Sequence, residues 1–252
     1  MLETDRGMRR CSLFIALAAL GIASLPAPAW AGVPVAANPA LAERLVAAAP
    51  AANPTVLALA ARAAECARKQ GVLDSLRHLA VIDYSLPSTQ PRLWVFDVEH
   101  GRLMFQELVA HGRNTGEARS ERFSNSEGSH MSSIGLFKTL QPYYGSNGYS
   151  LRLSGLDPGF NDNALSRAIV MHGAPYVSTA IAERLGRLGR SWGCPAVRTE
   201  VARTVIDTLK GGALLFAYYP DSKWLAESPY FQCDQPAANR TLAAAPHRAK
   251  AG

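Results

Sequence analysis

Residues 166–198 read SRAIVMHGAPYVSTAIAERLGRLGRSWGCPAVR, and this stretch decides what kind of domain the chain forms. The apolar run at 168–171 has the length and composition of a buried strand. We expect this strand to deliver His172 to its end. Cys194 follows Gly193 in a turn, and the proline after it is expected to stop regular structure.

A histidine at a strand end and a cysteine in a turn can meet in space. Such a pair is sufficient for covalent acyl transfer, because the thiolate attacks a carbonyl and the imidazole takes and returns the proton. Each residue alone has a simpler interpretation, since a lone cysteine in an exported protein is usually half of a disulfide. A lone histidine at a strand end is usually a surface or core residue. Gly173 and Gly193 favour the catalytic interpretation, because glycine lets a substrate backbone approach closely.

This layout resembles the L,D-transpeptidases of bacterial cell-wall synthesis. Their signature is His-Gly, a spacer, and then Ser/Thr-His-Gly-Cys. Here His172 and Gly173 are followed by seventeen residues and then by Ser-Trp-Gly-Cys at 191–194. The chain departs from the family pattern twice: Trp192 replaces the usual His, and Pro-Ala at 195–196 replaces the polar or basic residues that often follow the Cys.

The resemblance implies a mainly β fold, with a β-sandwich catalytic domain preceded here by a short helical hairpin. It also implies peptidoglycan stem peptides as the partner. Cys194 would attack the third residue of a stem tetrapeptide and release D-Ala, with His172 as the base. No metal or organic cofactor is implied. If water resolves the thioester instead of an amine, the site is an L,D-carboxypeptidase. The acyl acceptor and the group that orients His172 stay open.

Other candidate site residues surround this pair. Backbone amides around Trp192, Gly193 and Cys194 are expected to hold the oxyanion. The segment at 133–137 weakly resembles a Pro-x-Gly-x-Phe segment of the family, and the aromatic pair at 143–144 could form a wall of the cleft, although both also fit ordinary surface loops. The further substrate-binding candidates are Ser191, Gly173, Ser133, Gly135, Tyr144 and Arg190.

The N-terminus has the features of a signal peptide. Arg9 and Arg10 precede an apolar run at 12–25, which is short for a membrane span. Small residues at 29 and 31 predict cleavage after Ala31, which leaves 221 of the 252 residues and lowers the net charge from +6 to +5. We therefore expect a protein of the periplasm or cell wall, without a transmembrane anchor after cleavage. Its basic charge favours anionic partners such as stem-peptide carboxylates, and no pattern for nucleic-acid binding is present.

Cleavage leaves three cysteines, an odd number: Cys66, Cys194 and Cys233. If Cys194 is the nucleophile, Cys66 and Cys233 are free to pair. A bond that closes so long a loop would stabilise the fold by about 4–5 kcal/mol in the chain-entropy model. The sequence alone does not bring the two cysteines together.

The sequence predicts four parts for the whole chain: a signal peptide at 1–31, a helical segment at 32–76, the catalytic domain at 77–235 and a disordered basic tail at 236–252. Two helices are expected to start at Pro39 and Pro54, each after an Asn. Alternating apolar residues predict strands at 79–84, 92–98, 102–110, 151–153, 168–171 and 213–218, and helices are predicted at 178–185 and 199–209.

Three competing functions fit fewer residues. Residues 189–193 satisfy G-x-S-x-G, but a serine hydrolase needs an apolar strand before Ser191 and a histidine downstream; the only one is His247, in the predicted tail. A metal hydrolase would need an H-E-x-x-H motif or similar ligand spacing. A wall-binding scaffold with a degenerate site is suggested by the two departures from the family pattern.

Overall fold

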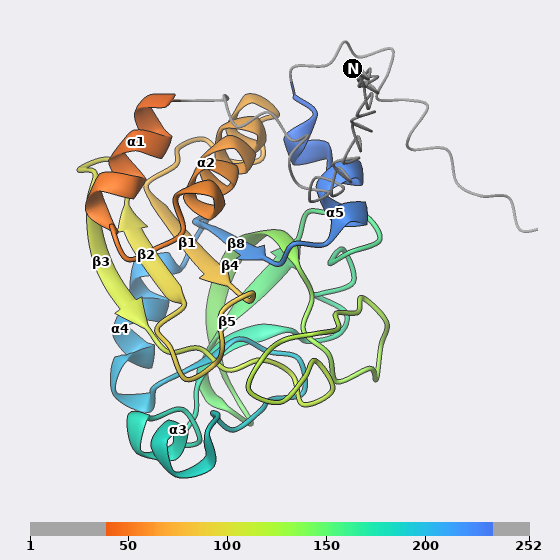
Figure 1. Cartoon of the computed structure of the whole chain (residues 1–252). Coiled ribbons are helices and arrows are strands. Elements are labelled where there is room, and N and C mark those ends of the chain that lie inside the picture. The colour runs from red at the N-terminus through yellow and green to blue at the C-terminus, as the bar shows by residue number, and fades with distance from the viewer. Residues whose placement is uncertain (1–38, 234–252) are drawn as a thin grey trace, which may run out of the picture.

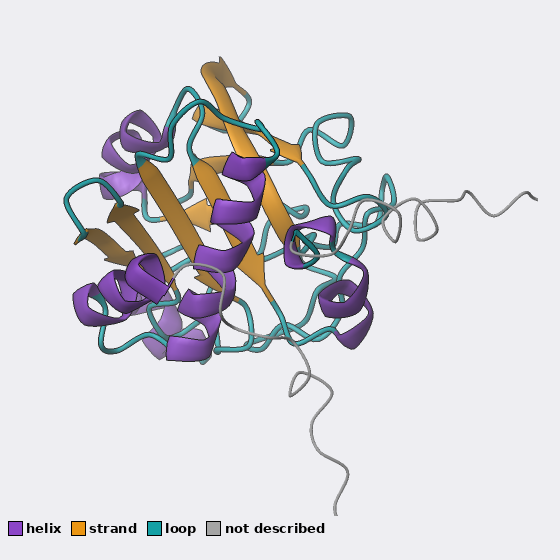
Figure 2. Ribbon diagram, turned by 90° about the horizontal axis from the view of Figure 1, so that it is seen from above, coloured by secondary structure: helices purple, strands orange, loops and turns teal. Residues whose placement is uncertain are grey.

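The computed structural model describes residues 39–233 of the chain (Figure 1). The predicted signal peptide and the predicted tail at 236–252 lie outside this range and stay predictions. Within the described range, a central sheet is flanked by helices (Figure 2). The predicted fold class, mainly β with helical appendages, is confirmed. No helix in this part of the chain is long and apolar enough to cross a membrane.

Eight strands form one continuous hydrogen-bonded sheet. They are β1 (His78–Asp83), β2 (Leu93–Asp97), β3 (Arg102–Glu107), β4 (Gly135–Gly145), β5 (Gly148–Gly155), β6 (Val170–Gly173), β7 (Ala196–Val197) and β8 (Leu214–Tyr218). Their order is β3-β2-β1-β8-β4-β5-β6-β7. Neighbours are antiparallel except β1–β8 and β6–β7. Ala110, just beyond β3 at one edge, bridges to Ala196 of β7 at the other, so the sheet folds over and nearly closes on itself.

Strand β1 shows how this sheet separates two hydrophobic cores. Leu79 and Val81 belong to an outer core shared with the helices, whereas Ala80 and Ile82 belong to an inner core enclosed by the strands. Successive side chains of a strand point to opposite faces, so one continuous apolar run serves both cores. The inner core brings together the two halves of the folded sheet, as expected of the predicted β-sandwich.

Two N-terminal helices, α1 (Pro39–Ala48) and α2 (Pro54–Lys69), form the expected hairpin against the outer face of the sheet (Figure 1). The side chain of Asn53 caps α2 by accepting a hydrogen bond from the amide of Thr55 at 2.9 Å. Most side chains of α2 are buried, and its many alanines let the helix lie close to the strands. The hairpin therefore shares one hydrophobic core with the sheet.

The C-terminal end of the described range packs against the same outer core. Helix α5 (Ser222–Glu227) and a 3₁₀ turn (Pro229–Phe231) follow β8, and neither is predicted by the sequence. Trp224 is fully buried there, with ring centroids 5.5 Å from Phe216 and 5.4 Å from Phe231. Aromatic packing, rather than a periodic apolar pattern, fixes this segment.

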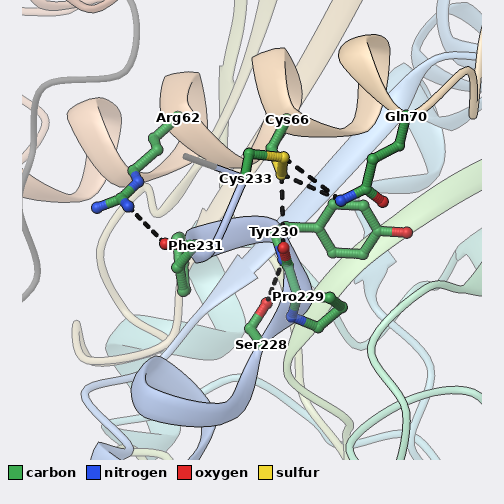
Figure 3. Close-up of a disulfide and its surroundings, with 8 residues drawn as sticks. All are labelled: Arg62, Cys66, Gln70, Ser228, Pro229, Tyr230, Phe231 and Cys233. Atoms are coloured by element: carbon green, nitrogen blue, oxygen red, sulfur yellow. Dashed lines mark hydrogen bonds between the residues drawn. A yellow bond between two sulfur atoms is a disulfide. The ribbon is translucent and has the colours of Figure 1, made fainter. Parts of the chain in front are cut away.

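The expected disulfide joins Cys66 of α2 to Cys233 (Figure 3). The two Cα atoms lie 5.6 Å apart, within the range that a disulfide spans. The side-chain amide of Gln70 donates to both sulfur atoms at 3.4 Å, and Arg62 donates to the carbonyl of Phe231. The bond thus fastens the C-terminal turn to the N-terminal hairpin.

Several boundaries differ from the sequence predictions: β3 ends at Glu107 instead of Ala110, and β5 covers Gly148–Gly155 instead of 151–153. Strand β4 covers a segment that the sequence suggested as a loop and a cleft wall, because Pro142 and a register shift beside it interrupt the alternation. Strand β6 begins at Val170, two residues late, because Ala168 adopts a left-handed φ of 54°. Pro195 does not end regular structure, since β7 starts at the next residue.

Helices α3 (Thr179–Leu185) and α4 (Thr199–Leu209) lie close to where the sequence predicts them. Helix α4 packs against the inner core and lies directly behind β6. A Cβ atom on Gly173 would lie 2.8 Å from the Cβ of Ala202, so glycine is required for this close approach. The helix thereby supports the strand that carries His172.

Candidate active site

Cys194 lies at the end of a tight turn that its neighbours hold from within. The hydroxyl of Ser191 donates to the carbonyl of Cys194 at 2.6 Å and accepts from the amide of Gly193 at 3.0 Å. Gly193 has a φ of 121°, and a Cβ there would meet the carbonyl oxygen of Met131 at 2.7 Å. Only glycine fits this position without strain.

A second set of hydrogen bonds holds the turn from outside. The hydroxyl of Ser132 donates to the carbonyl of Gly193 and accepts from the amide of Gly112, both at 3.0 Å. The amide of Ser191 donates to the carbonyl of His111 at 3.0 Å. The turn that carries Cys194 is therefore fixed to two other loops by these hydrogen bonds.

His172 lies in β6, between Ser150 of β5 and Ala196 of β7. Its side chain is buried, and Nδ1 lies 3.0 Å from the carbonyl oxygen of Gly173. Because a carbonyl oxygen can only accept, Nδ1 carries the proton and Nε2 keeps a free lone pair. Burial lowers the pKa of His172, so the imidazole is neutral at neutral pH. The orienting partner that the sequence left open is this backbone carbonyl.

The sulfur of Cys194 is also buried and lies among backbone groups. The amide of Val170 approaches it at 3.5 Å, and the thiol lies 3.8 Å from the carbonyl oxygen of Ala168. Burial raises the pKa of Cys194, and this effect exceeds the opposing influences of the Val170 amide and the Arg167 cation. The resting site thus holds a neutral thiol and a neutral imidazole.

Both groups line one open cavity of about 590 Å³. Its size is typical of sites that hold small molecules or peptide ends. Its other lining residues are the apolar segment 168–170 and the polar or aromatic residues Tyr143, Ser146, Asn147, Arg167, Tyr176, Arg190, Ser191 and Trp192. The fold therefore brings together the histidine and the cysteine that the sequence selected.

Residues 48–218 match the sequence model of the L,D-transpeptidase catalytic domain. The chain belongs to this family. Similar solved structures include an L,D-transpeptidase from Mycobacterium smegmatis (13% identity, TM-score 0.35, covering 57% of this chain and 59% of that one). L,D-transpeptidase 3 from Mycobacterium tuberculosis shows 17% identity and a TM-score of 0.35, with 57% and 61% covered. The helical cell shape determining protein Pgp2 from Campylobacter jejuni shows 12% identity and a TM-score of 0.38, with 61% and 55% covered.

The chain spans roughly three fifths of the length of these solved structures. No curated protein sequence matches it. The transpeptidase family assignment consequently rests on the match over residues 48–218.

Of the other residues that the transpeptidase resemblance suggests, some line the cavity and others do not. Arg190, Ser191 and Trp192 line the cavity with the cysteine. Ser133 donates to the carbonyl of Ser124 and does not line this cavity. Their roles in substrate binding stay predictions.

Three more of the suggested residues do not line the cavity that contains His172 and Cys194. Gly135 packs at the start of β4, where a Cβ would lie 2.6 Å from the Asp157 carboxylate. Gly173 packs on α4, as described above. Tyr144 is 70% exposed on the β4–β5 hairpin, and its neighbour Tyr143 lines the cavity instead.

Arg167 was not predicted from the sequence, and it lines the cavity together with the Cys194 thiol. Its guanidinium donates to the carbonyl oxygens of Ser124 and Met131, at 2.7 and 2.8 Å. It also donates to the hydroxyls of Ser129 and Ser133. An arginine just before an apolar strand is not a recognisable sequence pattern, so the sequence did not indicate that Arg167 lines the cavity. Within residues 39–233, no group of three His, Cys, Asp or Glu side chains is arranged to hold a metal ion.

Proposed function

We propose that this protein is an exported cysteine L,D-transpeptidase that forms a Cys194 thioester and releases D-Ala from a peptidoglycan stem tetrapeptide. The observation that carries the proposal is the shared cavity: Cys194 and a Nδ1-protonated His172 line it together, in a chain that belongs to the transpeptidase family. Export to the periplasm or cell wall rests on the leader sequence alone.

The acylation step follows from the protonation states of the pair. Nε2 of His172 takes the proton as the sulfur of Cys194 attacks the carbonyl of the third stem residue. The new C–S bond forms, the C–N bond to D-Ala breaks, and the imidazolium returns its proton to the leaving amine. Because both groups start neutral, the proton moves during the attack rather than before it.

The turn also supplies donors for the oxyanion. The amide of Gly193 is occupied by the Ser191 hydroxyl. Among the described residues, the amides of Trp192 and Cys194 have no acceptor. These two amides are therefore the donors that we assign to the oxyanion, in place of all three amides expected from the sequence.

Two alternatives use the same residues differently. If water attacks the thioester, the product is a tripeptide acid and the enzyme is an L,D-carboxypeptidase. A degenerate wall-binding scaffold would bind stem peptides without forming a thioester. A serine hydrolase is disfavoured, because the Ser191 hydroxyl is held between Gly193 and Cys194 within the turn.

The test is intact-mass spectrometry of the full chain after incubation with a stem tetrapeptide or a carbapenem, whose warhead mimics the acyl donor. We expect one adduct on Cys194, the only free thiol among the described residues. Cys194→Ala should abolish the adduct, and His172→Ala should slow its formation by about 10²–10⁴-fold while leaving the fold intact. Adduct formation by Cys194→Ala, or near-normal rates in His172→Ala, would contradict the proposal.

A further inference from the structure

Arg167 is a half-buried cation in the wall of the cavity that contains Cys194. Within residues 39–233, no carboxylate forms an ion pair with its guanidinium. The other arginine in this wall, Arg190, differs because it forms an ion pair with Glu117 at 2.6 Å. Arg167 therefore contributes a positive charge that no acid of the described range offsets.

Four oxygen atoms hold the guanidinium of Arg167 in one orientation. Nη1 donates to the carbonyl of Ser124 at 2.7 Å and to the hydroxyl of Ser133 at 2.6 Å. Nη2 donates to the hydroxyl of Ser129 at 3.1 Å and to the carbonyl of Met131 at 2.8 Å. All four acceptors are neutral, so they orient the group without removing its net charge.

The backbone that follows Arg167 supplies the contacts of the Cys194 sulfur. Ala168 has a left-handed φ of 54°, and its carbonyl oxygen lies 3.8 Å from the thiol. The amide of Val170 approaches the sulfur at 3.5 Å. Both contacts are neutral backbone groups. The short segment 167–170 thus holds the sulfur in place and carries the cation at one of its ends.

The other titratable groups that face the sulfur are uncharged at neutral pH. Burial lowers the pKa of His172, and burial raises the pKa values of Tyr84 and Tyr176 to about 12. Burial also raises the pKa of Cys194 itself, while the Val170 amide and the Arg167 cation act in the opposite direction. Among the described residues, Arg167 is therefore the charged group that acts on the thiol.

We propose that Arg167 is the electrostatic partner of the Cys194 sulfur, and that its fixed charge stabilises the sulfur whenever the sulfur is negatively charged. Arg167 is a positioning residue in this role, because it acts through its field while His172 transfers the proton. Its contribution to acyl transfer rests on the proposed function. Its effect on the free thiol does not.

Negative charge reaches the sulfur at two points of the proposed reaction. During acylation the thiol proton passes to Nε2 of His172 while the C–S bond forms. When an amine or water resolves the thioester, the C–S bond breaks and its electron pair stays on the sulfur. Nε2 takes the proton of the attacking group and returns it to the thiolate. A fixed cation stabilises both stages, because opposite charges attract more strongly in a partly desolvated cavity than in water.

The experiment measures the rate at which iodoacetamide alkylates Cys194 in the full chain as a function of pH, with the adduct located by peptide mass mapping. Removing the cation should destabilise the thiolate and raise the pKa of the thiol. For Arg167→Met we expect the midpoint of the profile to rise by about one pH unit, and the rate at neutral pH to fall about tenfold. Arg167→Gln should behave in the same way. Its amide still offers a donor to the loop, so it tests the charge even where Arg167→Met does not fold.

Three further variants separate the charge from the hydrogen bonds. Arg167→Lys keeps the charge and loses the planar fork, so its midpoint should shift by less than half as much as that of Arg167→Met. Ser129→Ala removes one oxygen that holds the guanidinium and leaves the charge in place. Arg184→Gln is the matched control, because it removes an exposed positive charge on α3 that does not line the cavity. The last two should keep the midpoint of the wild type.

Unchanged midpoints in both uncharged Arg167 variants would overturn the proposal. Equal shifts in Arg167→Lys and Arg167→Met would also overturn it, because they would assign the effect to the hydrogen bonds. Alkylation requires no stem peptide, so this test does not depend on the proposed function. If the wild type forms no thioester with a tetrapeptide, the proposed function fails, and the alkylation profile still decides the role of Arg167.

Discussion

The hydroxyl of Ser132 donates a hydrogen bond to the carbonyl oxygen of Gly193 at 3.0 Å, across 61 residues of sequence. The same hydroxyl accepts from the amide of Gly112. One buried side chain thus links the turn at 191–194 to the loop that carries Gly112. The geometry of the turn that holds Cys194 therefore depends on this hydroxyl.

Removing this hydroxyl should impair both stability and acylation. In Ser132→Ala the Gly112 amide and the Gly193 carbonyl lose a buried partner, which should lower the free energy of unfolding by about 1–3 kcal/mol. Because the turn is then less firmly held, we expect thioester formation to slow by about tenfold. Urea unfolding and D-Ala release measure the two effects. Ser166→Ala, at an exposed site, is the control; equal behaviour of both variants would contradict the role of Ser132.

The pH dependence of acylation should reflect a pair that starts neutral. The pKa of His172 is lowered by burial, so its base form persists below the ordinary histidine value of 6.5. We therefore expect the rate of thioester formation to fall only below about pH 6.5. Because burial raises the pKa of Cys194, alkylation of the free enzyme by iodoacetamide should be slow at neutral pH and increase toward alkaline pH. Rapid alkylation at neutral pH would instead indicate a preformed thiolate–imidazolium pair.

Trp192 should influence how the thioester is resolved more than how it forms. Its indole is 70% exposed and stacks on His130 with ring centroids 5.1 Å apart, at the edge of the catalytic cavity. In the proposed mechanism the amide of residue 192 serves the oxyanion whatever its side chain. We expect Trp192→His to retain acylation, and Trp192→Ala to favour hydrolysis over amine transfer. The ratio of cross-linked dimer to tripeptide measures how the thioester is resolved, and the rate of D-Ala release measures how fast it forms. Loss of acylation in Trp192→His would show that the indole itself is needed to form the thioester.

Loss of the disulfide should destabilise the fold without affecting the chemistry directly. The bond joins residues 167 positions apart, so the chain-entropy model gives a contribution of about 5 kcal/mol. Cys66→Ser/Cys233→Ser should lower the free energy of unfolding by up to this amount and retain thioester formation at low temperature. Cys194→Ser is the matched control, because it removes a thiol that takes no part in the bond. Equal stability of both variants would show that the bond contributes little.

Local patterns in the sequence were sufficient to predict much of the fold. The Asn-Pro starts of α1 and α2, and the alternation in β1, β2 and β8, are signals within single segments. Strand β4 was not predicted, because Pro142 and a register shift interrupt its pattern while its pairing with β8 depends on distant residues. Helix α5 is stabilised by aromatic contacts that no short window contains.

The candidate site was also predicted only in part from the sequence. His172 and Cys194 were selected because their spacing and their neighbouring glycines form a recognisable motif. Arg167 lies at the cavity because of hydrogen bonds to a loop more than thirty residues earlier in the chain. Such relationships exist only in three dimensions.

The disulfide between Cys66 and Cys233 also constrains the order of events during synthesis. A ribosome produces the chain from its N-terminus, so Cys194 becomes available to Cys66 before Cys233 has been made. Wherever oxidation begins before Cys233 has been made, Cys194 is the first partner that Cys66 meets. A wrong pairing would block Cys194 and leave Cys233 unpaired. Correct maturation therefore requires either that oxidation waits until the chain has been made as far as Cys233, or that thiol–disulfide exchange releases Cys194 afterwards.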